Sequence, residues 1–515
     1  MTQQKSDRRI LSEGTRKDAP IRGAERPGGE KATTVTKRYR QLELPFKTAE
    51  NPKGTSGTPD SGGTQSGLCE EPKLKDKNST TEAATMTEVI VRLESAFERV
   101  ARNQGAPGPD GETIQVVREN LPDILRRLSK ELADGTYLPG DIRRVWIPKA
   151  SGGQRGLGIP NVVDRMVQEA IRQVLEPVYE PTFHNNSHGF RPGRSCHTAI
   201  AQARSFVEEG YDWVVDIDLS KFFDRVHHQR LLARLSSTVK DPILLSIIAR
   251  FLKAKVIMPD GVKVSTDEGV PQGGPLSPLL SNIVLDEFDR ELSRRGHRFV
   301  RYADDCNIYV GSPRAGQRVK ASVTRFLERR LRLQVNEDKS AVARPEERHF
   351  LGFSLRRDAL TGEVEVHLSA RSEQRLRARI KELTPRLWGN SLRACIGEVT
   401  RYLRGWMGFF HICTEETLMV FGSVDAHVRR RLRAIQLAQW KSKRTIARRF
   451  TQLGMKRSTA HRAVYQGAHR LWYLSRYPGN WALKNAYFAH RGLVSLKELW
   501  HRHHDLGMVA PPNEG

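Results

Sequence analysis

Two adjacent carboxylates, Asp304 and Asp305, stand between apolar and aromatic residues in the segment RYADDCNIYV. Aspartate is frequent in hairpin turns, so this pair alone fits a solvated turn as well as a functional site. A second pair, Asp216 and Asp218, occupies alternate positions of the segment WVVDIDLS, so both side chains would share one face of a strand. Carboxylates on a buried strand are unfavourable unless a cation or hydrogen-bond donors compensate them. Two such clusters in one domain indicate that they meet.

Asp218, Asp304 and Asp305 would form an all-oxygen site if adjacent strands bring them together. Such a site suits Mg²⁺, a hard ion that takes carboxylates, water and substrate phosphates. Two ions about 3.5–4 Å apart would stabilise the attacking and leaving oxygens of a phosphoryl transfer. The sequence therefore favours metal-assisted phosphoryl transfer.

The charge of the chain predicts the class of its partner. A net charge of +26 and a pI near 10.1 indicate a polyanion held by counterion release. From Arg371 to the end, 27 Lys and Arg face nine Asp and Glu, so most of the excess lies in the C-terminal part. An anionic membrane surface is the competing partner, but no basic amphipathic anchor helix stands out.

The composition is that of a soluble protein of two to four domains, with 515 residues, 38% hydrophobic content and no long apolar run. The N-terminus has no apolar stretch behind its charges, which argues against a secretory signal. The five cysteines include no CxxC pair, which argues against a disulfide framework and a thiolate zinc site. We expect a cytoplasmic protein with reduced thiols and no membrane partner.

Several elements must position the carboxylates. Residues 1–85 are rich in Gly, Pro, Ser, Thr and Lys without apolar periodicity, which predicts a disordered basic tail. A helix is expected to follow, with Thr87 as its N-cap. A second helix is predicted over PLSPLLSNIVLDEFDRELSRRG, with Ser277 as N-cap and Pro278 in the first helical position. WVVDIDLS is predicted to be a buried strand, and HRFVRYADDCNIYVGS a hairpin that turns at the two aspartates.

The remaining pattern is that of an α+β region followed by helices. Helices are predicted over NLPDILRRLSKELADG, NVVDRMVQEAIRQVLEPVY and QRVKASVTRFLERRLRL, and strands over IRRVWIPK and a pair around RHFLGFSLRRD and GEVEVHL. After Arg371 the chain is predicted to be helical, and the spacing of Trp406 and Phe410 favours a place in the helix core.

At this point the motifs resemble a known family. RYADDCNIYV, VVDIDLSKFFD and GVPQGGPLSPLLSN are similar to the palm of a reverse transcriptase, and in particular to the group II intron-encoded branch. IPKASGGQRGLGIPNVVDRMVQEAI, HGFRPGRSCHTAI and LQVNEDKS appear in the order of that family, and the resemblance runs from about Val89 to His501. Each motif alone is moderately specific, whereas the ordered set is highly specific.

The resemblance implies a right-hand polymerase fold of the α+β class. Fingers and palm, with a ferredoxin-like antiparallel sheet, would cover residues 86–370, a helical thumb and maturase domain 371–440, and a basic helical RNA- and DNA-binding region 441–515.

The resemblance also assigns roles to the carboxylates. It implies Asp218 and Asp304 as the principal ligands of two Mg²⁺ ions, Asp305 as the third catalytic carboxylate, and the Leu219 carbonyl as a candidate further ligand. Asp216 has no such role in the family. We interpret it as a buried carboxylate bonded to backbone or to a basic neighbour.

Three basic residues are expected near the triphosphate, because the metal ions neutralise only part of its charge. Lys149 and Arg155 flank the glycine turn of PKASGGQRG, a fingers hairpin by resemblance, although surface charge on a β-turn is the alternative. Lys339 in NEDKS matches the lysine thought to protonate the leaving pyrophosphate, and a solvated loop lysine is almost as consistent with the sequence.

Four further residues are predicted around the sugar, base and primer. Phe223 matches the bulky aromatic residue that would clash with a 2′-hydroxyl, although a core phenylalanine is the alternative, as for Phe222. Gln272 is followed by two glycines that would let backbone approach a base pair, unless PQGG is a simple helix-entry loop. HFLGFSL resembles the hairpin that grips the primer end, which nominates Leu351 and Gly352.

The C-terminal region interleaves basic and aromatic residues, a pattern typical of proteins that hold structured RNA. Helix core with a solvated charged face is the alternative. The predicted RNA contacts are Arg429, Arg430, Arg431, Arg433, Lys441, Lys443, Arg444, Arg448 and Arg449. His501, His503 and His504 could bind a metal, but a frayed polar tail explains them as well. The last residues contain no cysteine pairs, so no HNH endonuclease is expected.

The sequence thus predicts an RNA-directed DNA polymerase that is encoded by a group II intron and also acts as a maturase in splicing and mobility. Expected partners are the intron RNA in a ribonucleoprotein, an RNA template with a DNA primer, dNTPs, target DNA and a second copy in a homodimer. Missing an endonuclease, the protein would need another primer source. Two rivals are an RNA chaperone with an inert palm and a reverse transcriptase recruited to repair or defence. The intact carboxylates argue against the first, and the DNA around the reading frame would decide the second.

Overall fold

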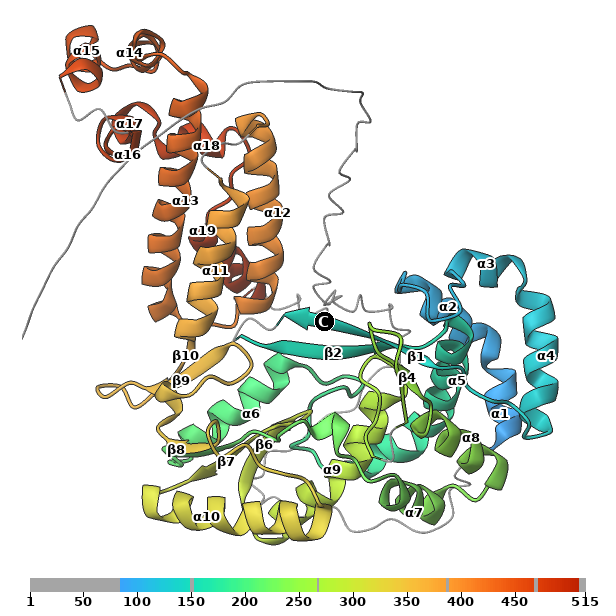
Figure 1. Ribbon diagram of the computed structural model, residues 1–515. Coiled ribbons are helices and arrows are strands. Elements are labelled where there is room, and N and C mark those ends of the chain that lie inside the picture. The colour runs from blue at the N-terminus through green and yellow to red at the C-terminus, as the bar shows by residue number, and fades with distance from the viewer. Residues whose placement is uncertain (1–83, 149–151, 266–267, 386–388, 467–470, 509–515) are drawn as a thin grey trace, which may run out of the picture. The chain divides into compact units, whose positions relative to one another are not determined.

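The computed structural model describes residues 84–148, 152–265, 268–385, 389–466 and 471–508 (Figure 1). All but the last two residues of the predicted N-terminal tail lie outside these ranges. Within them, no helix has the length and apolar character needed to cross a bilayer.

Four short helices open the described part of the chain. They are α1 (Met86–Val91), α2 (Leu93–Arg102), α3 (Ile114–Glu119) and α4 (Leu121–Ala133). The predicted N-cap at Thr87 is wrong, because the hydroxyl of Thr85 accepts the Glu88 N–H and the buried Met86 already belongs to the helix. Thr85 therefore ends the tail and begins the folded unit.

A mixed sheet carries the predicted fingers hairpin. Its order is β2 (Gln154–Ile159), β1 (Ile142–Pro148), β4 (Val256–Ile257) and β5 (Lys263–Val264). Strands β1 and β2 are antiparallel, whereas β1 and β4 are parallel. The helices of this region are α5 (Val162–Tyr179), η1 (Glu180–Thr182), α6 (Cys196–Glu208), η2 (Phe222–Asp224), α7 (His228–Thr238) and α8 (Pro242–Leu252).

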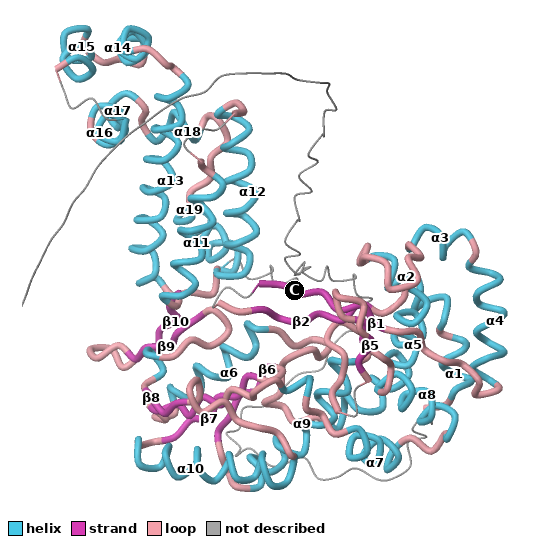
Figure 2. Tube along the Cα trace, viewed as in Figure 1, coloured by secondary structure: helices cyan, strands magenta, loops and turns pink. Residues whose placement is uncertain are grey.

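An antiparallel sheet carries the acidic motifs (Figure 2). Its order is β6 (Arg298–Tyr302), β7 (Asp305–Val310), β3 (Trp213–Ile217) and β8 (Ala341–Ala343). Alternate residues face two cores: Val215 and Ile308 join one core, whereas Val214 and Tyr309 join another. The buried strand predicted for WVVDIDLS is confirmed.

Helix α9 (Ser277–Arg294) packs its apolar side chains into the first of these cores. The predicted N-cap role of Ser277 is wrong: Leu276 is the N-cap, and Ser277 is already helical. The Ser277 hydroxyl donates to the Pro271 carbonyl at 2.7 Å and so ties the helix to the preceding loop. The predicted hairpin is present, but its turn is formed by Ala303 and Asp304, since Asp305 already pairs with Tyr302.

The sheet is followed by α10 (Pro313–Phe326), a π-helical turn η3 (Leu327–Leu331), η4 (Pro345–Glu347) and the hairpin of β9 (Phe353–Arg357) and β10 (Val364–Leu368). Every later described element is helical, as predicted. These elements are α11 (Ala370–Leu383), α12 (Leu392–Phe410), η5 (Glu415–Thr417), α13 (Leu418–Gln439), α14 (Lys443–Gln452), α15 (Arg457–Tyr465), α16 (Leu471–Arg476), α17 (Pro478–Ala482), α18 (Asn485–Ala489) and α19 (Leu496–Met508).

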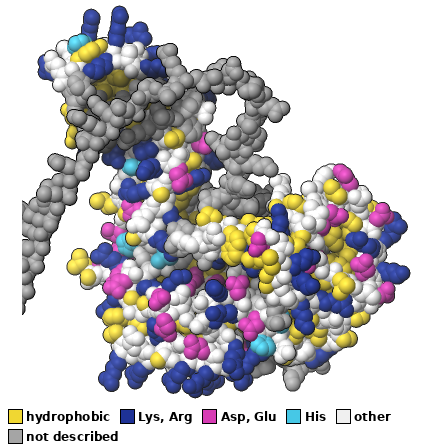
Figure 3. All heavy atoms as spheres, in the orientation of Figure 1, with side chains coloured by type: hydrophobic (Ala, Val, Ile, Leu, Met, Phe, Trp, Pro, Cys, Tyr) yellow, Lys and Arg dark blue, Asp and Glu magenta, His cyan; other side chains and the backbone are white. Residues whose placement is uncertain are grey.

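The helical region joins the second core and also carries much of the positive charge. Trp406 and Phe410 stack at 4.3 Å and lie half-buried against that core, close to the prediction. Dark-blue Lys and Arg side chains project from the α14 and α15 end in the view of Figure 3. From residue 426 to 497 the sequence contains no Asp or Glu, so nothing acidic in this stretch offsets the charge.

Candidate active site

The register of β3 and β7 brings three predicted carboxylates together. Ile217 pairs with Cys306, and because the strands are antiparallel, Asp218 lies across from Asp305. Asp304 occupies the adjoining turn. The Asp218 N–H donates to the Ser340 hydroxyl at 3.0 Å, and its carbonyl accepts the Asn336 N–H at 2.8 Å, so the strand end is fixed to the segment before β8.

The pKa values of Asp304 and Asp305 reflect the crowding of negative charge in this cluster. Burial raises the pKa of Asp304, and the nearby Asp218 charge raises it further, whereas the Arg155 guanidinium lowers it. Burial raises the pKa of Asp305 to about 7, and the negative charges of Asp304, Asp216 and Asp218 add to this effect. A cation would therefore bind in competition with a proton at this position.

The donor set fits Mg²⁺ as a partly protein-held ion. Among the described residues, no three His, Cys, Asp or Glu side chains lie close enough to hold a metal unaided. Mg²⁺ commonly takes one or two carboxylates and completes its shell with water and substrate phosphates. Hard oxygen donors whose mutual repulsion is uncompensated match that requirement.

The fourth carboxylate, Asp216, is compensated by the protein itself. Arg348 Nε donates to Asp216 Oδ2 at 3.0 Å, and a second guanidinium nitrogen donates to the same oxygen. Arg348 also donates to the Lys339 carbonyl at 2.8 Å. Burial raises the pKa of Asp216, and Arg348 opposes this by stabilising the ionised form. The interpretation of Asp216 as bonded to a basic neighbour is confirmed.

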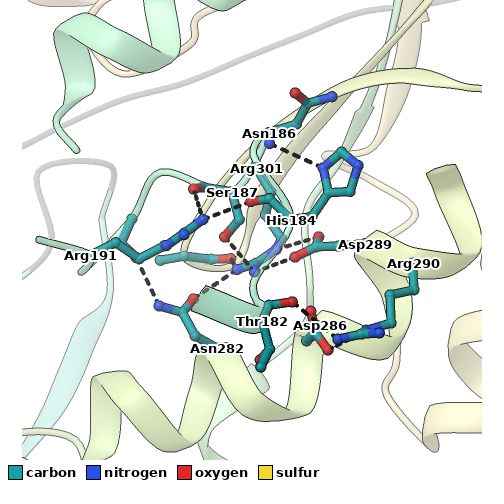
Figure 4. A network of polar contacts seen from close by, with 12 residues as sticks. Thr182, His184, Asn186, Ser187, Arg191, Asn282, Asp286, Asp289, Arg290 and Arg301 are labelled. Atoms are coloured by element: carbon teal, nitrogen blue, oxygen red, sulfur yellow. Dashed lines mark hydrogen bonds and ion pairs between the residues drawn. The ribbon is translucent and has the colours of Figure 1, made fainter. Parts of the chain in front are cut away.

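Behind the catalytic turn lies a buried arginine that the sequence prediction missed (Figure 4). Arg301 is 1% exposed, and its guanidinium donates to both oxygens of Asp289 at 2.7 and 2.6 Å. It also donates to Asn282 Oδ1 at 3.0 Å, to the Ser187 hydroxyl at 2.7 Å and to the Ala303 carbonyl at 2.9 Å. The last bond holds the backbone of the turn that carries Asp304.

The Arg301 network joins three separate sequence motifs. Ser187 directly precedes the segment HGFRPG. Asn282 and Asp289 lie on α9, and Arg301 lies on β6. Gly189 lies so close to the turn that a Cβ there would stand 2.3 Å from the Ala303 nitrogen. Residues 282, 286 and 289 form a polar stripe among the buried positions of α9. That stripe, together with Arg301 in the strand RFVRY, is the feature of the sequence from which this buried network could have been predicted.

Comparison with known proteins identifies this arrangement. A family described as "Reverse transcriptase (RNA-dependent DNA polymerase)" matches residues 147–355, which include all three carboxylates, and a family described as "Group II intron, maturase-specific domain" matches residues 373–454. The chain belongs to the group II intron-encoded reverse transcriptase and maturase family. The recognition made from the motifs, the α+β fold class and the reverse transcriptase and maturase function are thereby confirmed.

Curated relatives support this membership. Protein YkfC of Escherichia coli (strain K12) is 34% identical over 322 residues, which cover 55% of this chain and 84% of YkfC. The group II intron-encoded protein LtrA of Lactococcus lactis subsp. cremoris is 32% identical over 51% of this chain and 54% of LtrA. The putative COX1/OXI3 intron 2 protein of Saccharomyces cerevisiae is 28% identical over 56% of this chain and 40% of its own length. The match thus spans only about half of the two intron-encoded relatives.

Lys339 and Arg155, two of the residues expected near the nucleotide, lie close enough to interact with the carboxylates. Lys339 Nζ lies 3.5 Å from Asp218 Oδ2, although the Lys339 side chain is 63% exposed. Arg155 is exposed on β2, and its charge reaches Asp304 and Asp305. Leu219 is buried and forms an antiparallel bridge with Val335. Lys149 lies outside the described residues.

Phe223 and Gln272 belong to two loops that hydrogen-bond to their neighbours. The Phe223 carbonyl accepts the Val270 N–H at 2.6 Å, and its ring is half-buried beside the fully buried Phe222. The Gln272 carbonyl accepts the Gly158 N–H from β2 at 2.6 Å. The Phe223 and Gln272 loops are therefore tied to each other and to the fingers strand.

The two glycines of PQGG also have a reason within the protein itself. A Cβ on Gly273 would stand 2.2 Å from the Gly158 carbonyl oxygen, and one on Gly274 would stand 2.2 Å from Gln168 Oε1. Gly273 also has φ +124°, where a side chain is strained. Contacts within the protein, without any base pair, already require both glycines.

Leu351 and Gly352 line a cleft beside the carboxylates. The cleft, of about 680 Å³, is lined by Asp216, Asp218, Asp305, Asp338, Lys339, Glu347, Arg348, His349, Phe350, Leu351, Gly352, Arg371, Ser372, Arg375, Phe409 and Phe410. Leu351 and Gly352 have φ +52° and +101°, and a Cβ on Gly352 would stand 3.2 Å from the Phe410 ring. The backbone predicted to grip the primer thus lines the same cleft as Asp218 and Asp305.

The predicted RNA contacts divide into two groups. The exposed group is Lys441, Lys443, Arg444, Arg448 and Arg449. Arg433 is 5% exposed, its Nε donates to the Leu483 carbonyl at 3.1 Å, and burial lowers its pKa to about 10. The prediction for Arg433 as an RNA contact is therefore wrong, because its side chain belongs to the helical core.

The other α13 arginines lie half-buried. Arg431 donates to the Thr384 side chain and carbonyl at the end of α11, which is a structural use of its guanidinium. Arg430 contacts His427 Nδ1 at 2.7 Å, and Arg429 is half-buried. The frayed tail expected for His501 to His504 is wrong as well, since these residues lie on α19 and His504 Nε2 contacts the His411 carbonyl at 2.9 Å.

Arg301→Met should lower the free energy of unfolding by about 3–5 kcal/mol, because Asp289 would be left buried without a counter-charge. We expect cDNA synthesis to fall with it, since the Ala303 carbonyl loses its donor. Unfolding in urea measures the first effect. The double variant Arg301→Met with Asp289→Leu should recover part of the stability.

The matched control for this measurement is Arg294→Met, which breaks an exposed ion pair with Glu291. Its effect on the free energy of unfolding should be much smaller, because an ion pair of a solvent-exposed arginine contributes little to stability. An Arg301→Met protein as stable as the Arg294→Met protein would contradict the role given to the buried pair.

Asp305→Asn should change the pH dependence of stability when divalent cations are chelated. The folded chain holds a proton on Asp305 up to about pH 7, whereas the ordinary pKa of an aspartate side chain is 3.8, so stability falls as the pH rises through this window. The variant should therefore unfold at a higher temperature than wild type at pH 8 and at the same temperature at pH 4. Adding Mg²⁺ at pH 8 should stabilise wild type more than Asp305→Asn.

Asp358→Asn is a control of opposite sign, because backbone N–H donors lower the pKa of the exposed Asp358. The unfolding temperature of this variant should lie furthest below that of wild type at pH 8. A difference between Asp305→Asn and wild type that does not vary with pH would rule out the crowded-carboxylate interpretation.

Proposed function

We propose that this chain synthesises DNA on an RNA template by a two-Mg²⁺ mechanism at Asp218, Asp304 and Asp305. The observation that carries the proposal is the placement of these three carboxylates at the end of β3, in the turn before β7 and at the head of β7, where desolvation and like charge raise the pKa of Asp305 to about 7. Bound there, Mg²⁺ would activate the primer 3′-hydroxyl and stabilise the leaving oxygen.

Each residue has a distinct part in the proposed reaction. Asp218 and Asp304 would be the principal ligands, with Asp305 as the third carboxylate and the Leu219 carbonyl as a further ligand. Arg348 keeps Asp216 compensated, so Asp216 stays out of the ligand set. The catalytic turn is held in place from behind by the Arg301 guanidinium.

The residues around this centre would bind and orient the nucleotide and the primer. Arg155 and Lys149 would pair with the triphosphate, and Lys339 would protonate the leaving pyrophosphate. The ring of Phe223 would exclude a 2′-hydroxyl, and Gln272 would face the new base pair. Leu351 and Gly352 would hold the primer end in the cleft that they share with Asp218.

The helical region is proposed to hold the intron RNA and to recognise target DNA. Its exposed basic residues lie on α14 and just before it, and no acidic residue offsets them. Helices α14 and α15 are joined by a four-residue turn that contains Gly454 at φ +95°, which is the pattern of a helix-turn-helix. Arg457 and Arg462 are exposed on its second helix, where duplex DNA could be read.

Asp304→Asn should abolish extension of a DNA primer on an RNA template, by at least about a hundredfold, because a ligand of the reacting centre is lost. The assay follows incorporation of a labelled dNTP with Mg²⁺ present. Asp260→Asn, on an exposed loop, should extend normally. Full activity in Asp304→Asn would instead favour a maturase whose palm is inert.

The double variant Arg448→Gln with Arg449→Gln should bind structured intron RNA more weakly and with a smaller salt dependence, since two phosphate contacts are lost. Filter binding at several salt concentrations measures both quantities. Arg325→Gln with Arg329→Gln, two exposed arginines far along the chain from α14, is the charge-matched control. Equal salt slopes for the two double variants would remove α14 from the RNA-binding surface.

A further inference from the structure

Phe190, in the segment HGFRPG, combines two unfavourable features. Its φ is +59°, a left-handed conformation that bulky residues rarely adopt. Its side chain is 51% exposed, although it is an apolar ring. Strained residues of this kind persist where the surrounding structure fixes them, and they cluster at functional sites.

The other strained residues of the chain point to the same place. Among the described residues, seven other than glycine have positive φ, and four of them lie in segments of the active site. These four are Phe190, Lys221, Ala303 and Leu351. Lys221 lies three residues after Asp218, Ala303 forms the catalytic turn, Leu351 lines the cleft, and Phe190 follows Gly189, which packs against the Ala303 backbone.

The loop around Phe190 is rigid because its neighbours are bonded on both sides. The Gly189 carbonyl accepts the Asn282 side-chain N–H at 2.9 Å, and Gly189 packs against the Ala303 backbone. The buried Arg191 donates to Glu180 at 2.9 Å and to the Ser187 carbonyl at 2.8 Å. The ring of Phe190 is thus presented to the surface by a fixed backbone.

The position of Phe190 relates it to the sheet. Ser187 bridges Arg301 at the free edge of β6, and the Phe190 ring centroid lies 6.4 Å from that of Tyr302. The sheet order β6-β7-β3-β8 places this edge on one side of the carboxylates. Tyr302 pairs with Asp305, which lines the cleft of Leu351 and Lys339. The Phe190 ring therefore lies at the β6 edge beside both the carboxylates and this cleft.

We propose that Phe190 contacts the RNA template strand, with its ring packed against a base or sugar next to the catalytic turn. The proposal rests on the proposed polymerase function. A nucleic-acid ligand suits the local charge, because Arg194, four residues after Phe190, donates to the uncharged Asn185 and so keeps its positive charge for a phosphate. Aromatic rings provide sequence-tolerant platforms for bases, as a template requires.

The test measures binding of a labelled DNA primer annealed to an RNA template, by fluorescence anisotropy, without dNTP. Phe190→Gly and Phe190→Asn both tolerate the backbone conformation, so neither should lower the unfolding midpoint. Both should weaken binding about fivefold to a hundredfold, the range for one base on an aromatic ring. Phe190→Tyr should bind as wild type does.

Gln104→Gly is the matched control, since Gln104 is also exposed and has φ +46°. It should leave affinity unchanged. A single abasic template nucleotide near the catalytic turn should weaken wild type but add nothing in Phe190→Gly, whereas an abasic primer nucleotide should act equally in both proteins.

Two results would overturn the proposal: unchanged affinity in Phe190→Gly, or coupling to the primer position in place of the template position. Failure of wild type to bind and extend any RNA-templated primer would instead refute the proposed function, so the two failures are distinguishable.

Discussion

Negative charge crowded at the end of β3 and the start of β7 is the constraint on which the catalytic region depends. Carboxylates removed from water must be paired, or their pKa values rise until they are neutral. Around the site the protein itself pairs two carboxylates, Asp289 on α9 with Arg301 and Asp216 on β3 with Arg348. Asp218 has only an exposed lysine, and Asp304 and Asp305 are left to a ligand that brings its own cations.

The same two arginines also fix the backbone around the site. Arg301 holds the Ala303 carbonyl, and Arg348 holds the Lys339 carbonyl, so each links a compensated carboxylate to a segment that faces the reacting groups. Residues with positive φ occur in these segments, and rigid surroundings are what maintain such conformations. Preorganisation of this kind allows the site to bind charged substrates without rearranging first.

Local patterns were sufficient for most elements and for the carboxylates. Period-two alternation identified β3, and the spacing of Asp216 and Asp218 placed them on one face. Long-range pairs were missed, because the partner of Arg301 lies on a helix and no local rule connects the two. The prediction for Arg433 was wrong for a related reason. A run of arginines is typical of an exposed surface, and the sequence does not show that Arg433 is buried between helices. The sequence indicated that the glycines of PQGG allow a close approach. It did not indicate that they pack against Gly158 and Gln168 of the protein itself.

The central claim is that three carboxylates hold metal ions while the fourth is reserved for Arg348. Crystals of the chain with a DNA primer, an RNA template, a dNTP and Mn²⁺ would locate the ions by anomalous scattering. We expect peaks bounded by oxygens of Asp218, Asp304 and Asp305, with Asp216 still bonded to Arg348. A peak on Asp216 with Arg348 displaced, or none beside Asp304, would contradict the account.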